Sequence, residues 1–108
     1  MDLNLVVLCG RLATPGELRV FDSGTRLLRL LVSLRTEEPT RRVDVVPVTL
    51  WDPEEDLVQA VKERGIRIWA VGAVQRRFWE GSDERRSRIE LVALQVTAHE
   101  PDTEEVEA

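Results

Sequence analysis

The 108 residues are 43% hydrophobic and 32% charged and carry a net charge of −5, a composition that is ordinary for one globular domain. No apolar run approaches the ~20 residues of a membrane-spanning helix. The N-terminus carries Asp2 rather than a basic start, and Asn4 and Gly10 break its apolar run, which argues against a signal peptide. Cys9 is the single cysteine, so an internal disulfide is excluded and a reducing cytoplasm is the expected location.

The N-terminal quarter predicts two strands separated by a bend. Residues 3–9 (LNLVVLC) alternate little, which is typical of a strand covered on both faces. Gly10 follows and favours the bend or bulge that a tight barrel needs at a corner. After a Pro-Gly turn comes the short strand ELR (residues 17–19), and the sequence DSGT then indicates a turn in which Gly24 takes a positive φ.

Residues 25–35 predict a long strand with two distinct faces. The core face consists of Leu28, Leu30, Val32 and Leu34, and the opposite, partly basic face consists of Arg29, Leu31, Ser33 and Arg35. A polar loop over residues 36–42 leads to a third strand over residues 43–51. Pro47 within that strand has no N–H to donate, so we expect an edge, a bulge or a donor position that faces away from a partner.

Residues 52–65 predict the only helix. Asp52 is the expected N-cap, Pro53 suits the first helical position, and the acidic residues 54–56 complement the positive end of the helix. Gly65 is expected to end the helix. The apolar stripe that should face the core consists of Leu57, Val58 and Val61.

Two further strands follow the helix. The fourth covers residues 66–79 with a bend at Gly72, and the fifth covers residues 86–97 after a turn through Gly81. We therefore place one domain over residues 1–98. Residues 99–108 are predicted to form a short, acidic, disordered tail.

The distribution of charge explains how an acidic chain could hold a basic surface. Five acidic residues lie among the last nine residues, which contain no basic residue. Removing these five from the twenty acidic residues leaves fifteen, which balance the fifteen basic ones. Fourteen of the basic residues are Arg, the side chain that both pairs with phosphate and stacks on bases.

The order of elements is three strands, one helix and two strands. This order predicts an all-β fold with one helix, namely the OB-fold: a five-stranded Greek-key barrel with its helix between strands 3 and 4. A β-sandwich or an SH3-like barrel fits less well, because neither places a helix at this point.

The chain also resembles the bacterial single-stranded DNA-binding proteins over residues 3–96. The resemblance rests on an ordered set of short blocks: Asn4, GRL (10–12), ELR (17–19), SGT (23–25), VTLW (48–51), RG (64–65), VG (71–72) and RFW (77–79). It implies an OB-fold, assembly into tetramers, and sequence-tolerant binding of single strands by aromatic stacking. Two of the family's stacking positions are aromatic here, at Trp51 and Trp79.

Polar residues near these tryptophans complete the expected DNA-binding set. Gln75 and Arg77 share the parity of Trp79 along their strand, so all three should face the same way. Further candidates for phosphate contact are Arg11, Arg29 and Arg35, with Arg19 as an additional one. The resemblance places Trp69 at a subunit contact, and we assign Val46 to the same oligomer interface.

The chain departs from the family pattern at several positions. No aromatic residue occurs in the loop 36–42, and Val45 stands where a further stacking tryptophan is usual. Asp52 and Pro53 replace a small and basic pair, which puts negative charge beside Trp51. The tail ends EVEA and lacks the phenylalanine tip through which family members recruit partner proteins, which argues against recruitment through this tail.

No catalytic arrangement is evident: there is no phosphate-binding loop, no metal-ligand spacing and no nucleophile beside a base. We therefore expect a non-enzymatic, cofactor-free bacterial protein of the cytoplasm, associated with the nucleoid, that binds single-stranded DNA in replication, recombination or repair. A homotetramer is expected, with a dimer as the other possibility. Two alternatives stay open: an OB-fold assembly subunit that has lost DNA binding, and a binder of single-stranded RNA.

Overall fold

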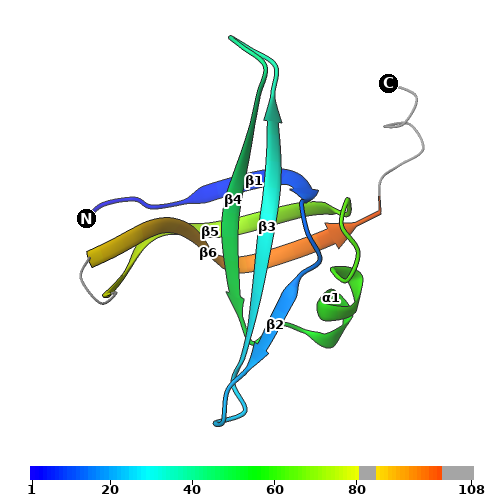
Figure 1. Ribbon diagram of the computed structural model, residues 1–108, viewed down its shortest axis with the longest axis vertical. Coiled ribbons are helices and arrows are strands. Elements are labelled where there is room, and N and C mark those ends of the chain that lie inside the picture. The colour runs from blue at the N-terminus through cyan, green and yellow to red at the C-terminus, as the bar shows by residue number, and fades with distance from the viewer. Residues whose placement is uncertain (81–84, 101–108) are drawn as a thin grey trace.

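The computed structural model describes the backbone of residues 1–80 and 85–100, and the side chains of all of these except residues 79, 80, 85 and 86. Its strands are β1 (Val6–Leu12), β2 (Glu17–Val20), β3 (Arg26–Thr36), β4 (Arg42–Trp51), β5 (Arg67–Glu80) and β6 (Arg85–His99), and its helix is α1 (Glu55–Ala60). The strands form one sheet in the order β1-β5-β6-β4-β3-β2 (Figure 1). Pairing of β1 with β3 closes this sheet into a barrel.

The closure occurs where β1 changes partner. Residues Val6 to Arg11 of β1 pair with β5, and Arg11 and Leu12 also pair with β3. Gly10 is needed at this crossing, because a Cβ there would collide with the carbonyl oxygen of Ser33 and would lie 2.8 Å from Leu34 Cδ2. Gly10 therefore allows the close approach of β1 to β3, and the register of β1 with β5 runs through it without a bulge.

The predicted five-stranded barrel is confirmed as well. Strands β1 and β2 together make up its first strand, interrupted at residues 13–16, and β2 pairs only with β3 among the described strands. Strands β4 and β6 are joined by a short parallel pairing at Val48 and Thr49. Pro47 lies just before that pairing, where this edge of β4 has no described ladder partner, in agreement with the prediction for a proline.

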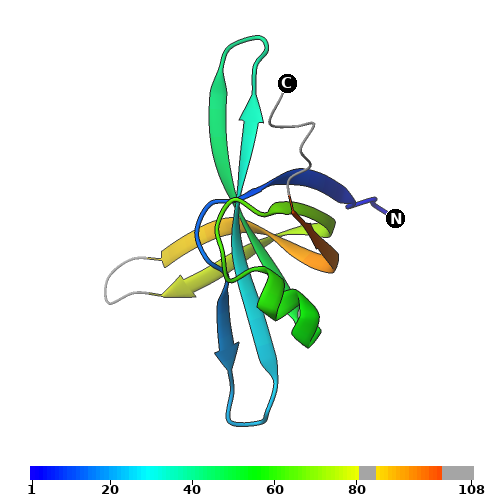
Figure 2. The same cartoon turned by 90° about the vertical axis from the view of Figure 1, so that its right-hand side faces the viewer.

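The barrel interior is filled by the alternating residues of β3 and its neighbours. Leu28, Leu30 and Val32 are buried, as the alternation in the sequence predicted, and they pack with Leu12 and Ile68. The helix covers one end of the barrel, below the crossing β5 and β6 strands in Figure 2. Val58 and Val61 of the predicted apolar stripe are buried there.

The helix is shorter than predicted, and Asp52 is not its N-cap. Helix α1 begins after Glu54, whose side chain makes no capping hydrogen bond. Asp52 instead adopts a positive φ of 49° and holds the ends of β3 and β4 together. Its backbone N–H donates to the carbonyl oxygen of Arg26 (2.8 Å), and its Oδ1 accepts from the backbone N–H of Arg26 (3.2 Å).

Strands β5 and β6 are bent by a bulge, as Gly72 led us to expect. Val71 lies opposite Gln95 whereas Gly72 lies opposite Ala93, so Leu94 is an extra residue in β6. A Cβ on Gly72 would collide with the carbonyl oxygen of Val92. The bulge leaves the Leu94 side chain 81% exposed.

Candidate nucleic-acid interface

Two aromatic rings stack on the outer side of the barrel at one end of β3. Trp51, the last residue of β4, lies with its ring centroid 5.9 Å from that of Phe21, at an interplanar angle of 27°. The guanidinium carbon of Arg19 lies 5.8 Å from the centroid of Phe21. Trp51 is 46% exposed and Phe21 37%, so both rings present area to solvent. We call Arg19, Phe21 and Trp51 the aromatic end.

Phe21 was missed in the sequence because no familiar motif contains it. The available signal was its spacing: it lies two residues after Arg19, so the two side chains leave the chain on the same side. After the Asp22–Thr25 turn the chain reverses direction and continues as β3, beside this segment. Leu27 of β3 lies opposite both Arg19 and Trp51 and is buried, which shows that the side chains around it cover it.

A hydrogen-bonded network fixes the backbone on which Trp51 sits. Besides the two contacts between Asp52 and Arg26, Arg26 Nη2 donates to Glu55 Oε2 at 2.9 Å. This hydrogen bond from Arg26, followed by one from Gln59, lowers the pKa of Glu55 below its usual 4.5. The negative charge that the sequence places beside Trp51 is that of Asp52, and its carboxylate accepts a hydrogen bond from the backbone of β3.

Polar residues continue the outer surface from β4 onto β5 and β6. Glu90 is buried and accepts a hydrogen bond from Thr49 Oγ1 (3.1 Å), which links β4 to β6. Gln75 lies opposite Glu90 in the register, and Arg77 Nη1 lies 4.0 Å from Glu90 Oε1. Arg29 lies opposite Thr49 on the next strand. Gln75, Arg77 and Arg29 therefore lie on the same outer surface.

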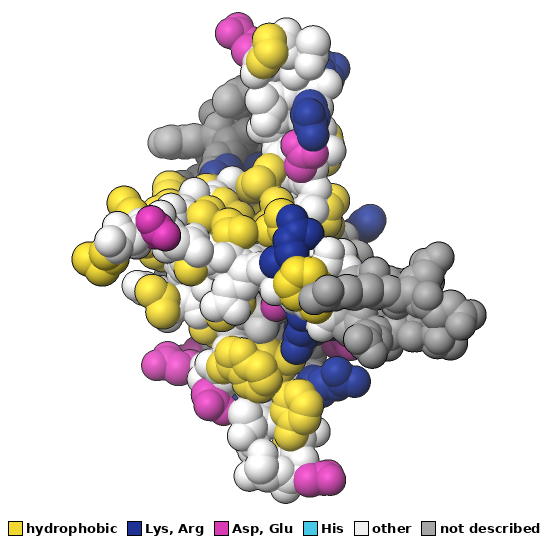
Figure 3. Space-filling model, turned by 90° about the vertical axis from the view of Figure 1, so that its left-hand side faces the viewer, with side chains coloured by type: hydrophobic (Ala, Val, Ile, Leu, Met, Phe, Trp, Pro, Cys, Tyr) yellow, Lys and Arg dark blue, Asp and Glu magenta, His cyan; other side chains and the backbone are white. Residues whose placement is uncertain are grey.

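Trp79 belongs to β5, opposite Arg86, but its side chain lies outside the described residues. Its predicted stacking role stays a prediction. Figure 3 views this side of the molecule: Lys and Arg side chains form a broken band down the face, and hydrophobic side chains lie beside the band.

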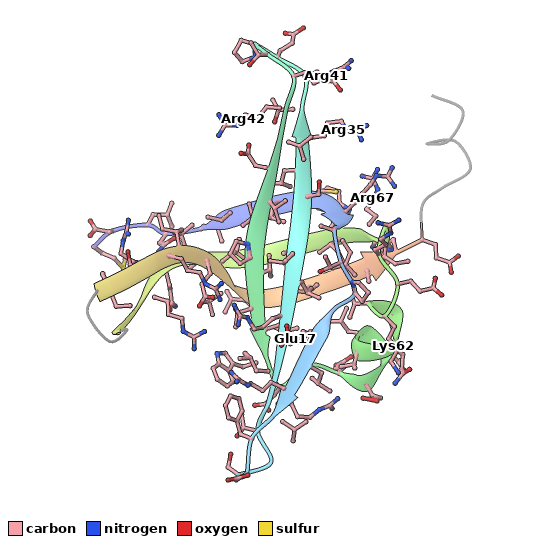
Figure 4. The ribbon with its side chains drawn as sticks, viewed as in Figure 1. Glu17, Arg35, Arg41, Arg42, Lys62 and Arg67 are labelled. Atoms are coloured by element: carbon pink, nitrogen blue, oxygen red, sulfur yellow. The ribbon has the colours of Figure 1, made fainter. Side chains whose placement is uncertain are left out.

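The structure separates Arg11 and Arg35 from the aromatic end. Both line a small cavity of about 210 Å³ together with Arg67, and they do so near the opposite end of β3. Arg35 and Arg67 project toward the same side of the molecule in Figure 4, whereas Arg42 projects toward the other side. The basic residues predicted for DNA contact therefore fall into two groups.

The two residues predicted for an oligomer interface are placed differently. Trp69 lies on the outer side of β5, opposite Cys9 of β1, and is 45% exposed. Val46 is partly buried and packs against the core, so it offers less surface to a partner than Trp69 does. Their interface role stays a prediction.

Within the described ranges 1–80 and 85–100, no helix is long and apolar enough to cross a membrane. The same residues contain no cluster of three His, Cys, Asp or Glu side chains placed to hold a metal ion.

Comparison with known proteins identifies the family. Residues 3–99 match the sequence model of the single-strand binding protein family. The chain belongs to this family. It is 26% identical over 100 residues to the single-stranded DNA-binding protein of Treponema pallidum, covering 88% of this chain and 57% of that protein. It is 25% identical over 79 residues to single-stranded DNA-binding protein 1 of a Nostoc species, covering 73% of this chain and 66% of that protein.

These alignments show that the chain spans less than two thirds of the length of either bacterial relative. Among solved structures, the fold is similar to a chain of a Plasmodium falciparum SSB complex with ssDNA. The TM-score is 0.78 at 16% identity, covering 94% of this chain and 97% of that chain. At this identity the likeness bears on the fold, and it agrees with the OB-fold barrel described above.

Proposed function

We propose that this single-strand binding family member binds single-stranded DNA without sequence preference, by stacking bases on exposed rings and pairing backbone phosphates with arginines. The observation that carries the proposal is the exposed Phe21–Trp51 stack with Arg19 against it. Every base has a π-face, so such a surface binds strands without reading their sequence. The names of the two bacterial relatives support the same ligand.

The size of the stacking contribution decides how much else is needed. Each stacked base contributes about 1–3 kcal/mol, so two stacking positions, Trp51 and Trp79, would supply roughly 2–6 kcal/mol. The middle of that span corresponds to about millimolar affinity. Arginine–phosphate contacts and the linkage of several protomers must therefore supply the rest, and binding should weaken as salt rises.

The proposal includes a homo-oligomer, a tetramer or a dimer, that presents several such surfaces. Strand β1 and the adjoining part of β5 expose apolar side chains on one outer side. Val7 lies opposite Val71 and Cys9 opposite Trp69, and Leu5, Val7 and Trp69 are each 45–60% exposed. An apolar surface of this kind favours a second copy of the chain. The proposed setting is the bacterial cytoplasm, in DNA replication, recombination or repair, without an enzymatic role.

The test is a titration with oligo-dT at low salt, followed by tryptophan fluorescence and by mobility shift. Matched titrations use a mixed-sequence DNA strand, the corresponding RNA and the duplex. We expect quenching with both DNA strands, similar affinities for the two, and weak binding of the duplex. If no strand causes a mobility shift or quenching, the protein does not bind DNA and the assembly-subunit alternative is supported. If RNA binds more tightly than DNA, the RNA-binding alternative is supported. Light scattering tests the oligomer independently, since a clean monomer contradicts it.

A further inference from the structure

The outer side of the barrel holds a second basic feature where β1 passes from β5 to β3. A cavity of about 210 Å³ opens there; among the residues that the structure describes, its lining contains three arginines, from β1, β3 and β5, and no acidic residue. The described lining residues are Cys9, Gly10, Arg11, Ser33, Arg35 and Arg67. We call this cavity the arginine pocket.

The register of the strands explains why these arginines meet. Arg11 lies opposite Ser33 on β3 and opposite Arg67 on β5, because β1 contacts both strands at this residue. Arg35 follows Ser33 by two residues, so it leaves β3 on the same side. Arg67 Nη1 also donates to Cys9 Sγ at 3.4 Å, which orients its side chain along β1. In Figure 4, Arg35 and Arg67 point to the same side of the barrel.

The chemistry of the arginine pocket matches an oxyanion. Guanidinium groups present N–H donors in a fork that fits phosphate oxygens, and such charge-assisted hydrogen bonds are among the stronger ones in proteins. A larger cavity of about 450 Å³ next to Trp51 differs in this respect, because its described lining contains Asp52 and Glu54 and no basic residue. By the described residues that line the two cavities, the arginine pocket has the charge that attracts a phosphate and the larger cavity does not.

The position of the pocket relates it to the aromatic end. Leu27, opposite Trp51, and Ser33, opposite Arg11, belong to the same side of β3. They lie six residues apart, which is about 20 Å at the rise of a β-strand. Arg29 and Leu31 lie between them on that side. One OB-fold covers about 4–16 nucleotides of single-stranded nucleic acid, so a single strand can extend over this distance.

We propose that the arginine pocket binds a backbone phosphate of the same DNA strand whose base stacks on Trp51, several nucleotides away. Arg67, which the sequence placed at no site, becomes a phosphate-binding residue together with Arg11 and Arg35. This inference rests on the proposed binding of single-stranded DNA. It adds a consequence that general phosphate contacts do not have: the contribution of Arg67 depends on the length of the strand.

The test compares Arg67→Gln with wild type on a series of oligo-dT lengths from 3 to 20 nucleotides, at several salt concentrations. For the shortest strands, which reach only the aromatic end, the two proteins should bind equally. For the longest strands, Arg67→Gln should bind about 3- to 10-fold more weakly at low salt. The slope of log K against log salt should also fall by about 0.7, the value expected for one lost phosphate contact on a single strand.

Arg42→Gln is the matched control for the loss of one positive charge. Arg42 pairs with Asp44 at 2.9 Å and projects to the other side of the molecule, so it should behave as wild type at every length (Figure 4). Arg35→Gln, at an exposed position, is a second variant that should reproduce the length dependence even if Arg67→Gln proves unstable in thermal melts. Equal effects of Arg67→Gln, Arg35→Gln and Arg42→Gln at all lengths would overturn the inference while leaving DNA binding intact. Absence of binding by the wild type would overturn both.

Discussion

The aromatic end and the arginine pocket lie at opposite ends of the same side of β3 and offer different chemistry to a ligand. At one end two exposed rings stack with an arginine against them. At the other, three arginines line a cavity whose described residues include no acidic side chain. Stacking depends little on salt, whereas phosphate pairing releases counterions and weakens as salt rises. The two proposed contributions to affinity are therefore separated in space and can be measured one at a time.

The two regions also differ in how the chain holds them. The aromatic end depends on a network of polar side chains, in which Asp52 and Glu55 both bond to Arg26. The arginine pocket depends on the close crossing of two strands at Gly10. Single side-chain substitutions should therefore change the geometry of the aromatic end in small steps, whereas the backbone determines the geometry of the arginine pocket.

The largest expected effect is that of Trp51→Ala on DNA affinity. Loss of one stacking ring costs about 1–3 kcal/mol, so oligo-dT should bind about 5- to 150-fold more weakly. Because stacking contributes no counterion release, the salt slope should stay that of wild type. Titrations at four salt concentrations measure both quantities. A lower salt slope in Trp51→Ala would contradict the assignment of stacking to the aromatic end and of phosphate pairing to the arginine pocket.

A smaller effect is expected from Phe21→Leu. Leucine keeps the apolar contact with Trp51 but removes the ring–ring interaction that holds the Trp51 ring in place. That interaction is worth about 0.5–1.5 kcal/mol, which bounds the loss of affinity at about 12-fold. Phe21→Tyr keeps a ring and serves as the control that should bind as wild type. If Phe21→Leu binds DNA as tightly as Phe21→Tyr does, Trp51 alone provides the stacking surface of the aromatic end.

The smallest effect is a pH dependence of stability at the aromatic end. The pKa of Glu55 is lowered in the folded protein, chiefly by its hydrogen bond with Arg26, so the unfolded chain binds this proton more readily. The resulting stabilisation is present above pH 4.5 and is lost as the pH falls through the lower folded pKa. Melting temperatures from pH 3 to 6 should show a wild-type advantage over Glu55→Gln that disappears toward the acidic end. An advantage that stays constant with pH would show that the carboxylate does not contribute through its charge.

The sequence predicted the barrel because burial repeats with the period of a strand. Leu28, Leu30 and Val32 alternate and are all buried, and Gly10 and Gly72 lie where strands approach closely. Asp52 was assigned wrongly because its local pattern suits a helix N-terminus, whereas its contacts are with Arg26, distant in sequence.

The candidate site was predictable only in part, for a related reason. Trp51 was identified by the resemblance to the family, and Gln75 and Arg77 by their parity with Trp79 along one strand. The stack of Phe21 on Trp51 and the meeting of Arg11, Arg35 and Arg67 depend on which strands become neighbours. Local alternation contains no information about that pairing.

The bulge at Leu94 determines which side of the barrel Glu90 faces. On the C-terminal side of the bulge the even-numbered residues of β6 point inward, since Val96 and Ala98 lie opposite the buried Ala70 and Ile68. On its N-terminal side the odd-numbered residues do, so Leu91 enters the core. Without that one extra residue the register would carry Glu90 into the core and remove its hydrogen bond to Thr49. Deleting Leu94 would therefore exchange the inward-facing and outward-facing side chains of β6 on the N-terminal side of the bulge.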